Sequence, residues 1–171
     1  MFKGILVILL ALCCLSGAAC SDNGAKNTAQ PALTFATPTP EPKVVYAQGF
    51  FDQEGTDGGT WRWMGPEGVV RLKNGGHDMT LTFAGSSPMH VFKSPVTIKL
   101  TFNGMPLDQF TGKAEGVEKR YEIPSSKLGS GDFSELRISS DKSMVPHEVD
   151  KTLQDSRRLA LSLSKLKWEE K

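Results

Sequence analysis

The chain has 171 residues, of which 39% are apolar and 23% charged, and its formal net charge is +1. This length suits one folded domain of ordinary size, and the charged fraction excludes a chain that is disordered throughout. The near-neutral charge argues against a dedicated nucleic-acid binder, which normally carries a basic face. All three cysteines fall within the first 20 residues, so any role for a thiol belongs to this N-terminal segment.

Residues 1–19 have the pattern of a secretory signal peptide. Lys3 supplies a positive charge, and residues 5–15 are almost wholly apolar. An apolar run of about 11 residues is too short to span a bilayer core, which needs roughly 20. It does fit the apolar segment of a signal peptide, and small residues follow it. The sequence therefore predicts an exported protein.

The segment Gly17-Ala18-Ala19-Cys20 resembles the lipobox of bacterial lipoproteins. The resemblance implies that the Cys20 thiol receives a diacylglyceryl group, that the chain is cut before Cys20, and that the new N-terminus is acylated. The family usually has Leu where this chain has Gly17, so an ordinary signal-peptidase cut stays open as an alternative. Ser21, rather than Asp, follows the cysteine, and by the same resemblance this implies the outer membrane in a Gram-negative host.

Cleavage before Cys20 would change the chemistry of the mature chain. Cys13, Cys14 and Lys3 would be removed, leaving 19 basic and 19 acidic side chains and, once Cys20 is lipidated, no thiol at all. Disulfides and a catalytic cysteine are therefore not expected, although an exported chain could have used disulfides. Attachment to the membrane is expected to rest on the acyl chains and not on charge.

Residues 20–43 are predicted to be a tether that starts at the lipidated cysteine. They are rich in Ala, Thr, Asn and Pro, with Pro38, Pro40 and Pro42 at alternate positions. So few large apolar side chains cannot offset the entropy cost of ordering the segment. The alternating prolines favour extended polyproline II. We expect a solvated linker that leads to a folded domain at residues 44–171.

Short strands separated by glycine-rich turns are predicted throughout residues 44–171. Apolar and polar residues alternate in segments that we expect to be strands: 44–51, 60–64, 68–72, 79–83, 96–102, 117–123 and 136–138. A last alternation begins at Leu159 and slips by one residue before Leu166, which predicts a β-bulge at Ser164-Lys165. Helical periodicity is weak everywhere, although residues 151–158 could form one turn. This pattern predicts an all-β fold, a single antiparallel β-sandwich or barrel.

Motifs for metal or nucleophilic chemistry are missing from the sequence. The three histidines stand far apart, and the spacings typical of zinc sites, serine hydrolases and phosphate-binding loops do not occur. No Asp-rich calcium loop occurs either. We therefore expect no cofactor, no resident metal and no catalytic site. A pair of carboxylates of the glycoside-hydrolase type stays open, because such a pair forms in space and not in sequence.

Two tryptophans stand two residues apart, with an arginine between them. On a strand, Trp61 and Trp63 share one face and Arg62 takes the other. Two indoles on one face could form a platform on which sugar rings stack. They could equally belong to the core, because an indole buries a large area. Both interpretations stay open at this stage.

Charged residues near both ends of the domain could meet. Glu54, Arg62, Asp155 and Arg157 are candidates for a structural ion-pair network that joins the first and last strands, because a buried arginine needs carboxylates or carbonyls. A polar ligand pocket is one alternative. A solvated run of charges at residues 150–158 is another.

The same residues carry a second resemblance. Residues 49–54, the Trp61-Arg62-Trp63-Met64 segment, Val145-Pro146 and residues 155–161 resemble a small β-sandwich domain of bacterial exopolysaccharide and glycosyltransferase proteins, sometimes found in lipoproteins. Ala160 stands where that pattern more often has Gly. The resemblance implies a jelly-roll-like sandwich with the architecture of carbohydrate-binding modules, but a fold alone does not confer a function.

These observations predict a lipid-anchored envelope protein whose domain is a non-catalytic binding module. In the first hypothesis the partner is a glycan: Trp61 or Trp63 stacks on a sugar ring, and Arg62, Glu54 or Asp155 binds hydroxyl groups. In the second hypothesis the partner is another envelope protein. An unrecognised hydrolase is the third.

Overall fold

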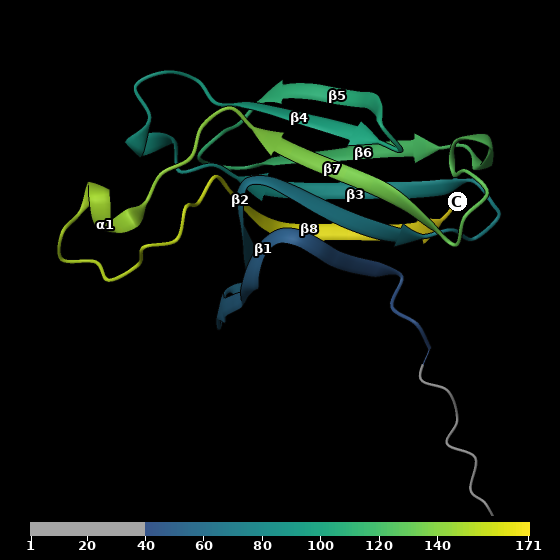
Figure 1. The fold of residues 1–171 in the computed structure, drawn as a ribbon, viewed down its shortest axis with the longest axis horizontal. Helices are drawn as coiled ribbons and strands as arrows, with labels where there is room; N and C mark the ends of the chain where they lie inside the picture. The colour runs from purple at the N-terminus through teal and green to yellow at the C-terminus, as the bar shows by residue number, and fades with distance from the viewer. Residues whose placement is uncertain (1–39) are drawn as a thin grey trace, which may run out of the picture. The chain divides into compact units, whose positions relative to one another are not determined.

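Eight antiparallel strands make up residues 40–171, which a computed structural model describes (Figure 1). The predicted signal peptide, Cys20 and most of the predicted tether lie outside the described residues. The strands are β1 (Val44–Thr56), β2 (Gly59–Lys73), β3 (Met79–Ser86), β4 (Thr97–Phe102), β5 (Met105–Thr111), β6 (Val117–Ile123), β7 (Phe133–Ser140) and β8 (Leu161–Glu170). The helices of this region are single turns: two 3-10 turns at Met89–Val91 and Ser125–Lys127, and α1 (Pro146–Val149). None of them is long and apolar enough to cross a membrane.

The long strand β2 links two layers of the fold. One layer contains β5, β4 and β7, and the other contains β8, β3 and β6. The strands follow the order β5-β4-β7-β2-β8-β3-β6, and β1 pairs with β2 outside this path. Residues 67–73 of β2 pair with β7, whereas residues 62–64 pair with β8. A strand that changes neighbours along its length bends from one sheet into another, as at the corners of β-sandwiches. The all-β sandwich predicted from the sequence is confirmed.

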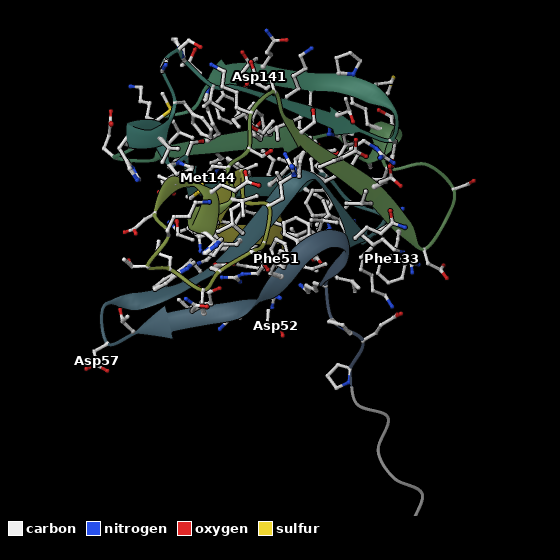
Figure 2. The ribbon with its side chains drawn as sticks, turned by 60° about the vertical axis from the view of Figure 1, so that its left-hand side comes forward. Phe51, Asp52, Asp57, Phe133, Asp141 and Met144 are labelled. Atoms are coloured by element: carbon white, nitrogen blue, oxygen red, sulfur yellow. The ribbon has the colours of Figure 1, made fainter. Side chains whose placement is uncertain are left out.

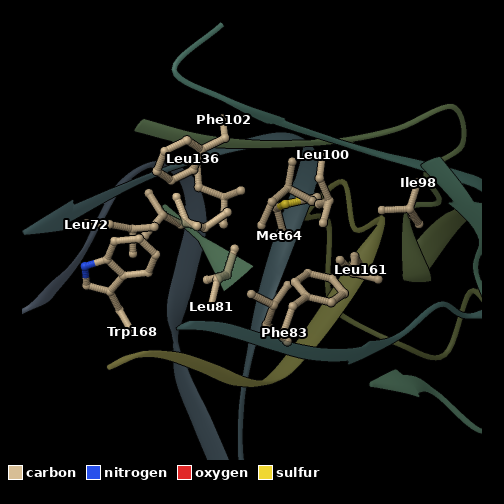
Figure 3. Packing of buried hydrophobic residues seen from close by; sticks show 14 of the residues in the cluster. Met64, Leu72, Leu81, Phe83, Ile98, Leu100, Phe102, Leu136, Leu161 and Trp168 are labelled. Carbon is tan, nitrogen blue, oxygen red and sulfur yellow. The ribbon is translucent and has the colours of Figure 1, made fainter. Parts of the chain in front are cut away.

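The core lies between these two layers (Figure 3). Phe102 of β4 lies against Trp168 of β8, with ring centroids 6.0 Å apart, and Phe83 of β3 meets Phe110 of β5 at 5.8 Å. The alternating residues of each strand supply this core because every second side chain faces inward. Its fully buried members include Met64, Val70, Leu72, Met79, Leu81, Ile98, Leu100, Ile123, Leu136, Ile138 and Leu161.

The edge strands β5 and β6 are held together by side chains. The Tyr121 hydroxyl donates a hydrogen bond to Asp108 Oδ2 at 2.8 Å, and Lys119 Nζ lies 3.3 Å from the same oxygen. Burial alone raises the pKa of the Asp108 carboxyl, but hydrogen bonds from Tyr121, Lys119 and the Gln109 amide outweigh it, so this pKa lies below its usual value. Burial and the Asp108 charge both raise the pKa of Tyr121. We call these contacts the β5–β6 clasp, because they join the two edge strands of the sheet.

Most predicted strands are present, with three differences. The segments expected at 60–64 and 68–72 form one strand, β2, which passes through Pro66 at a place where no partner strand is paired. Strand β5 was not predicted. The helical turn expected within residues 151–158 is wrong: the turn lies at Pro146–Val149, where a proline starts it.

The predicted bulge is confirmed in β8. Ala84 pairs with Lys165 and Gly85 with Leu163, so Ser164 is the extra residue.

Candidate functional site

The β1–β2 hairpin carries the residues of both sequence motifs. It projects beyond the sandwich to a turn at Asp57 (Figure 2). Glu54 of β1 lies opposite Trp61 of β2, and Trp63 lies opposite Ser162 of β8. Paired residues in an antiparallel ladder point to the same side, as do residues two apart on one strand. Glu54, Trp61 and Trp63 therefore share one face of the hairpin.

A bulge in β1 determines the sides of the strand on which Phe50 and Phe51 lie. Phe50 pairs with Met64 and Gln53 with Arg62, so β1 has one residue more than β2 in this interval. Phe50 contacts the core cluster and the Tyr46 ring, at a centroid distance of 4.9 Å. An extra residue re-aims the side chains that follow it. Arg157 contacts both the Phe51 ring and the Glu54 carboxylate, so Phe51 lies on the same side of β1 as Glu54.

Neither indole of the hairpin belongs to the core. Trp61 and Trp63 are half-buried, whereas Trp168 is only 2% exposed and is the tryptophan of the core cluster. The Trp168 ring nitrogen donates to the Lys73 carbonyl oxygen at 2.7 Å, as a buried indole requires. Two large aromatic side chains are therefore left partly open to solvent on one strand.

Arg157 joins two carboxylates on the same face. Its Nη1 donates to Glu54 Oε1 at 2.6 Å, and its Nη2 donates to Asp155 Oδ2 at 2.7 Å. Its Nε contacts both Asp155 oxygens, and its guanidinium carbon lies 5.1 Å from the centroid of the Phe51 ring. The side chains of Arg157, Glu54 and Asp155 are about one-third exposed, at 34%, 33% and 28%. We call Phe51, Glu54, Trp61, Trp63, Asp155 and Arg157 the hairpin face.

The contacts between Arg157 and the two carboxylates shift the pKa values of Asp155 and Arg157. The hydrogen bond from Arg157 holds the pKa of the Asp155 carboxyl below its usual value, although burial opposes the shift. Asp155 and Glu54 in turn raise the pKa of Arg157. Asp155 and Arg157 are therefore both charged at neutral pH. A general acid of the glycosidase type needs a raised pKa, so Asp155 is unsuited to that role.

The loop between β7 and β8 brings Arg157 to the hairpin. Met144 and Leu159 form a bridge across the loop, and the Ala160 amide donates to the Met64 carbonyl oxygen at 2.9 Å. The loop thus lies alongside the hairpin (Figure 2). A loop fixed by backbone hydrogen bonds can hold a charged group in one place without being buried itself.

Arg62 does not join the network, contrary to the sequence-based expectation. Its Nη1 donates to the Phe51 carbonyl oxygen at 2.6 Å, and its guanidinium carbon lies 4.7 Å from the centroid of the Tyr46 ring. In the part of the chain that the structure describes, it forms no ion pair. The physical reason is strand alternation: Arg62 points away from the side that carries Glu54. Burial raises the pKa of the Tyr46 hydroxyl, and the Arg62 charge partly opposes this.

Sequence reasoning did not assign a role to Phe51, a member of the hairpin face, or to Tyr46, whose ring contacts Arg62. A signal existed for the first: Phe50 and Phe51 are adjacent in a strand, where neighbours face opposite sides, so one of them had to leave the core. No such signal existed for Tyr46, because its contact with Arg62 joins residues 16 positions apart in a bulged register.

Metal binding has no obvious place in this region. Within residues 40–171, no three His, Cys, Asp or Glu side chains are grouped closely enough to hold an ion. The hairpin face thus offers aromatic rings, two carboxylates and a guanidinium. Such groups suit stacking and hydrogen bonding.

Comparisons with known proteins give only remote likenesses. No protein-family model and no curated protein sequence matches this chain. Among solved structures, it is similar to a family two carbohydrate esterase from Clostridium thermocellum in complex with cellohexaose. The identity is 9%, the TM-score is 0.35, and 72% of this chain is covered. The chain spans only 30% of the length of that esterase.

Two shorter structures are matched over most of their length. The C-terminal domain of EclA, a sugar-binding protein, is 13% identical with a TM-score of 0.38, over 82% of this chain and 88% of that one. The CBM36-1 domain of a multidomain xylanase from the hindgut metagenome of Trinervitermes trinervoides is 9% identical with a TM-score of 0.36, over 71% and 95%. At this level of likeness, function has to be argued from the residues of the chain itself.

Proposed function

We propose that this protein is a lipid-anchored lipoprotein of the bacterial cell envelope, and that its β-sandwich is a non-catalytic module that binds glycan through the hairpin face. The observation that carries the proposal is the pair of half-buried indoles, Trp61 and Trp63, on one side of a strand. Tryptophan side chains with one part buried and one part open to solvent are enriched at binding interfaces.

The two indoles supply the stacking surface. Side chains two residues apart on a strand lie roughly 6.5–7 Å apart along it, so Trp61 and Trp63 form a short row of rings. A sugar ring presents its C–H groups to an aromatic face, which buries apolar area without requiring a fixed charge.

The neighbouring network supplies hydrogen bonds to hydroxyl groups. Glu54 and Asp155 each keep acceptor capacity beyond their contacts with Arg157, because a carboxylate can accept about four hydrogen bonds. Since Arg157 holds both carboxylates in place, little side-chain entropy is lost when a ligand binds. The reduced pKa of Asp155 keeps it an acceptor at neutral pH and favours binding over acid catalysis.

Glycan binding can be tested on residues 40–171, which hold their own core. The fragment is titrated by calorimetry with a β-1,4-glucan hexamer, a chitin tetramer and trigalacturonate. Trp61→Ala and Trp63→Ala should each weaken binding about tenfold, equivalent to 1.4 kcal/mol. Phe133→Ala is the matched control, because Phe133 is also a half-buried aromatic residue but lies on β7. An absence of binding to every sugar would contradict the proposal and favour a protein partner.

The anchor needs a separate experiment because it concerns residues 1–20. Support for it comes from the resemblance of Gly17-Ala18-Ala19-Cys20 to the lipobox. Cells that express the full chain are labelled with radioactive palmitate. Label is expected in the wild type and in Cys13→Ala, and it should be lost in Cys20→Ala. Equal labelling of all three would contradict lipidation at Cys20. If Ser21 has the role expected of it, the labelled protein should be found in the outer membrane fraction of a Gram-negative host.

A further inference from the structure

A hollow opens where β2 and β8 separate. The two strands pair only through Arg62, Trp63 and Met64 of β2, and the bulge at Ser164 follows directly on β8. A bulge bends its strand and increases its local twist. The resulting space has a volume of about 260 Å³ and is lined by residues of β1, β2 and β8: Tyr46, Gln53, Thr60, Trp61, Arg62 and residues 163–167. We call it the β8 hollow.

All the charged side chains that line it are cationic. Arg62, Lys165 and Lys167 border the hollow, and no Asp or Glu does. Lys165 forms an ion pair with Glu118 at 3.0 Å. Among the described residues, Arg62 and Lys167 form no ion pair with a carboxylate. The hollow therefore carries excess positive charge, although the whole chain is close to neutral.

The hollow also has unpaired backbone along one wall. From Lys165 onward, β8 pairs with β3 alone within residues 40–171. The backbone groups on its other edge consequently have no strand partner there, and each is a hydrogen-bond donor or acceptor. Gln53, Thr60 and Ser164 add polar side chains. A ligand with both hydroxyl groups and negative charge could satisfy these groups.

Trp61 connects the hollow to the hairpin face. It lies opposite Glu54 on the hairpin and also borders the hollow. A glycan stacked on Trp61 would therefore place an adjacent group at the mouth of the hollow, which Lys167 borders and which Arg62 borders from the opposite face of β2. At about 260 Å³ the hollow lies just below the roughly 300–1,000 Å³ of drug-sized ligand pockets. It suits one charged sugar residue rather than a long segment of chain.

We infer that the β8 hollow binds the anionic group of an acidic glycan, such as the carboxylate of a hexuronic acid. The inference rests on the proposed glycan-binding function and names its ligand class. Arg62 has N–H groups beyond the one that binds the Phe51 carbonyl, and a guanidinium recognises a carboxylate well. Lys167 adds charge that attracts the ligand over a distance of about 10 Å at 0.1 M salt, whereas Glu118 largely offsets the charge of Lys165.

The test compares a charged ligand with its uncharged methyl ester. Residues 40–171 are titrated with trigalacturonate and with its fully methyl-esterified form. The acid should bind about tenfold more tightly at low salt, and the difference should shrink at high salt because of screening. Lys167→Gln should weaken binding of the acid about two- to fivefold, the range of a partly exposed ion pair, and Lys165→Gln should weaken it less because Lys165 is already paired with Glu118. Binding of the methyl ester should not change.

Lys99→Gln is the matched control. Lys99 is an exposed strand lysine of β4 that forms no ion pair among the described residues, and it lies outside the hollow. This variant should bind trigalacturonate like the wild type. Lys167→Gln is preferred to Arg62→Gln because Arg62 also holds the Phe51 carbonyl, so its loss could disturb the hairpin.

Three outcomes would overturn this inference, and a fourth would overturn the proposed function with it. Equal binding of acid and ester would remove the role of charge and leave the proposed glycan binding intact. Equal weakening by Lys99→Gln would show a general charge effect. Competition by inorganic phosphate as effective as the trisaccharide would show an anion site that does not recognise sugar. Failure of both trisaccharides and of the neutral sugars would contradict the proposed function as well.

Discussion

The three tryptophans should differ sharply in what they contribute to stability. Trp168 is 2% exposed and lies against Phe102, whereas Trp61 and Trp63 are half-buried on the hairpin. A buried indole removes about 150–250 Å² from water. At about 25 cal/mol per Å², this area corresponds to roughly 4–6 kcal/mol, and the truncation of a core Trp to Ala usually costs about 3–5 kcal/mol.

Trp168→Ala should therefore lower the free energy of unfolding by about 3–5 kcal/mol. Trp168→Phe keeps a ring but leaves the Lys73 carbonyl oxygen without its donor, at a cost of about 1–3 kcal/mol. Trp61→Ala and Trp63→Ala leave the core intact and should cost about 1–2 kcal/mol, because only part of each indole is removed from water.

Urea unfolding of residues 40–171, followed by far-UV circular dichroism, measures these differences. The slopes of the transitions should agree among the variants, so that midpoints can be compared. A loss for Trp63→Ala as large as that for Trp168→Ala would refute the reasoning. It would make Trp63 a core residue and remove the stacking surface from the proposed site.

Three further outcomes are expected. Gly49→Ala should cost at least about 3 kcal/mol, because Gly49 has a φ of +75° and a Cβ there would lie 1.9 Å from the Glu67 carbonyl oxygen. Gly76→Ala, with a φ of +74° and open space, should cost only about 1 kcal/mol, and equal melting points for the two variants would contradict this. Asp108 has a lowered pKa in the folded state, so its contribution to stability is complete above the unfolded pKa of about 3.9 and is lost as the pH falls through the folded value. In Asp108→Asn the melting temperature should fall less steeply as the pH is lowered. An unchanged fall would contradict the stabilising role of the contacts between Asp108, Tyr121 and Lys119. Arg157→Gln should cost about 1–2 kcal/mol and speed proteolysis within residues 141–160, whereas unchanged cleavage there would contradict its role in holding the loop.

Most of the fold could be predicted from the sequence because most strands bury one face in the core. Apolar and polar residues therefore alternate along them. The bulge at Ser164 was visible because it shifts the apolar phase between Leu163 and Leu166. Strand β5 was invisible for the corresponding reason. It is an edge strand that contains Pro106 and an irregular register opposite Leu100, so its apolar residues do not alternate.

The candidate site could be predicted only in part. Glu54, Asp155 and Arg157 were recognised as charges that need partners, and the structure brings them together. Arg62 was assigned to the same group because sequence gives residue type but not strand register. The register places it with Tyr46 instead. The β8 hollow depends on where two strands stop pairing, a property of the three-dimensional sheet that a local pattern does not contain.

The central claim is that a glycan contacts the hairpin indoles and leaves the core indole untouched. The most direct test records the three indole N–H signals of ¹⁵N-labelled residues 40–171 while trigalacturonate and the β-1,4-glucan hexamer are added in turn. Trp61→Phe, Trp63→Phe and Trp168→Phe assign the signals. With the sugar that binds, the signals of Trp61 and Trp63 should move while that of Trp168 stays in place. A spectrum in which neither hairpin signal moves with any sugar, or in which only Trp168 responds, would contradict the account.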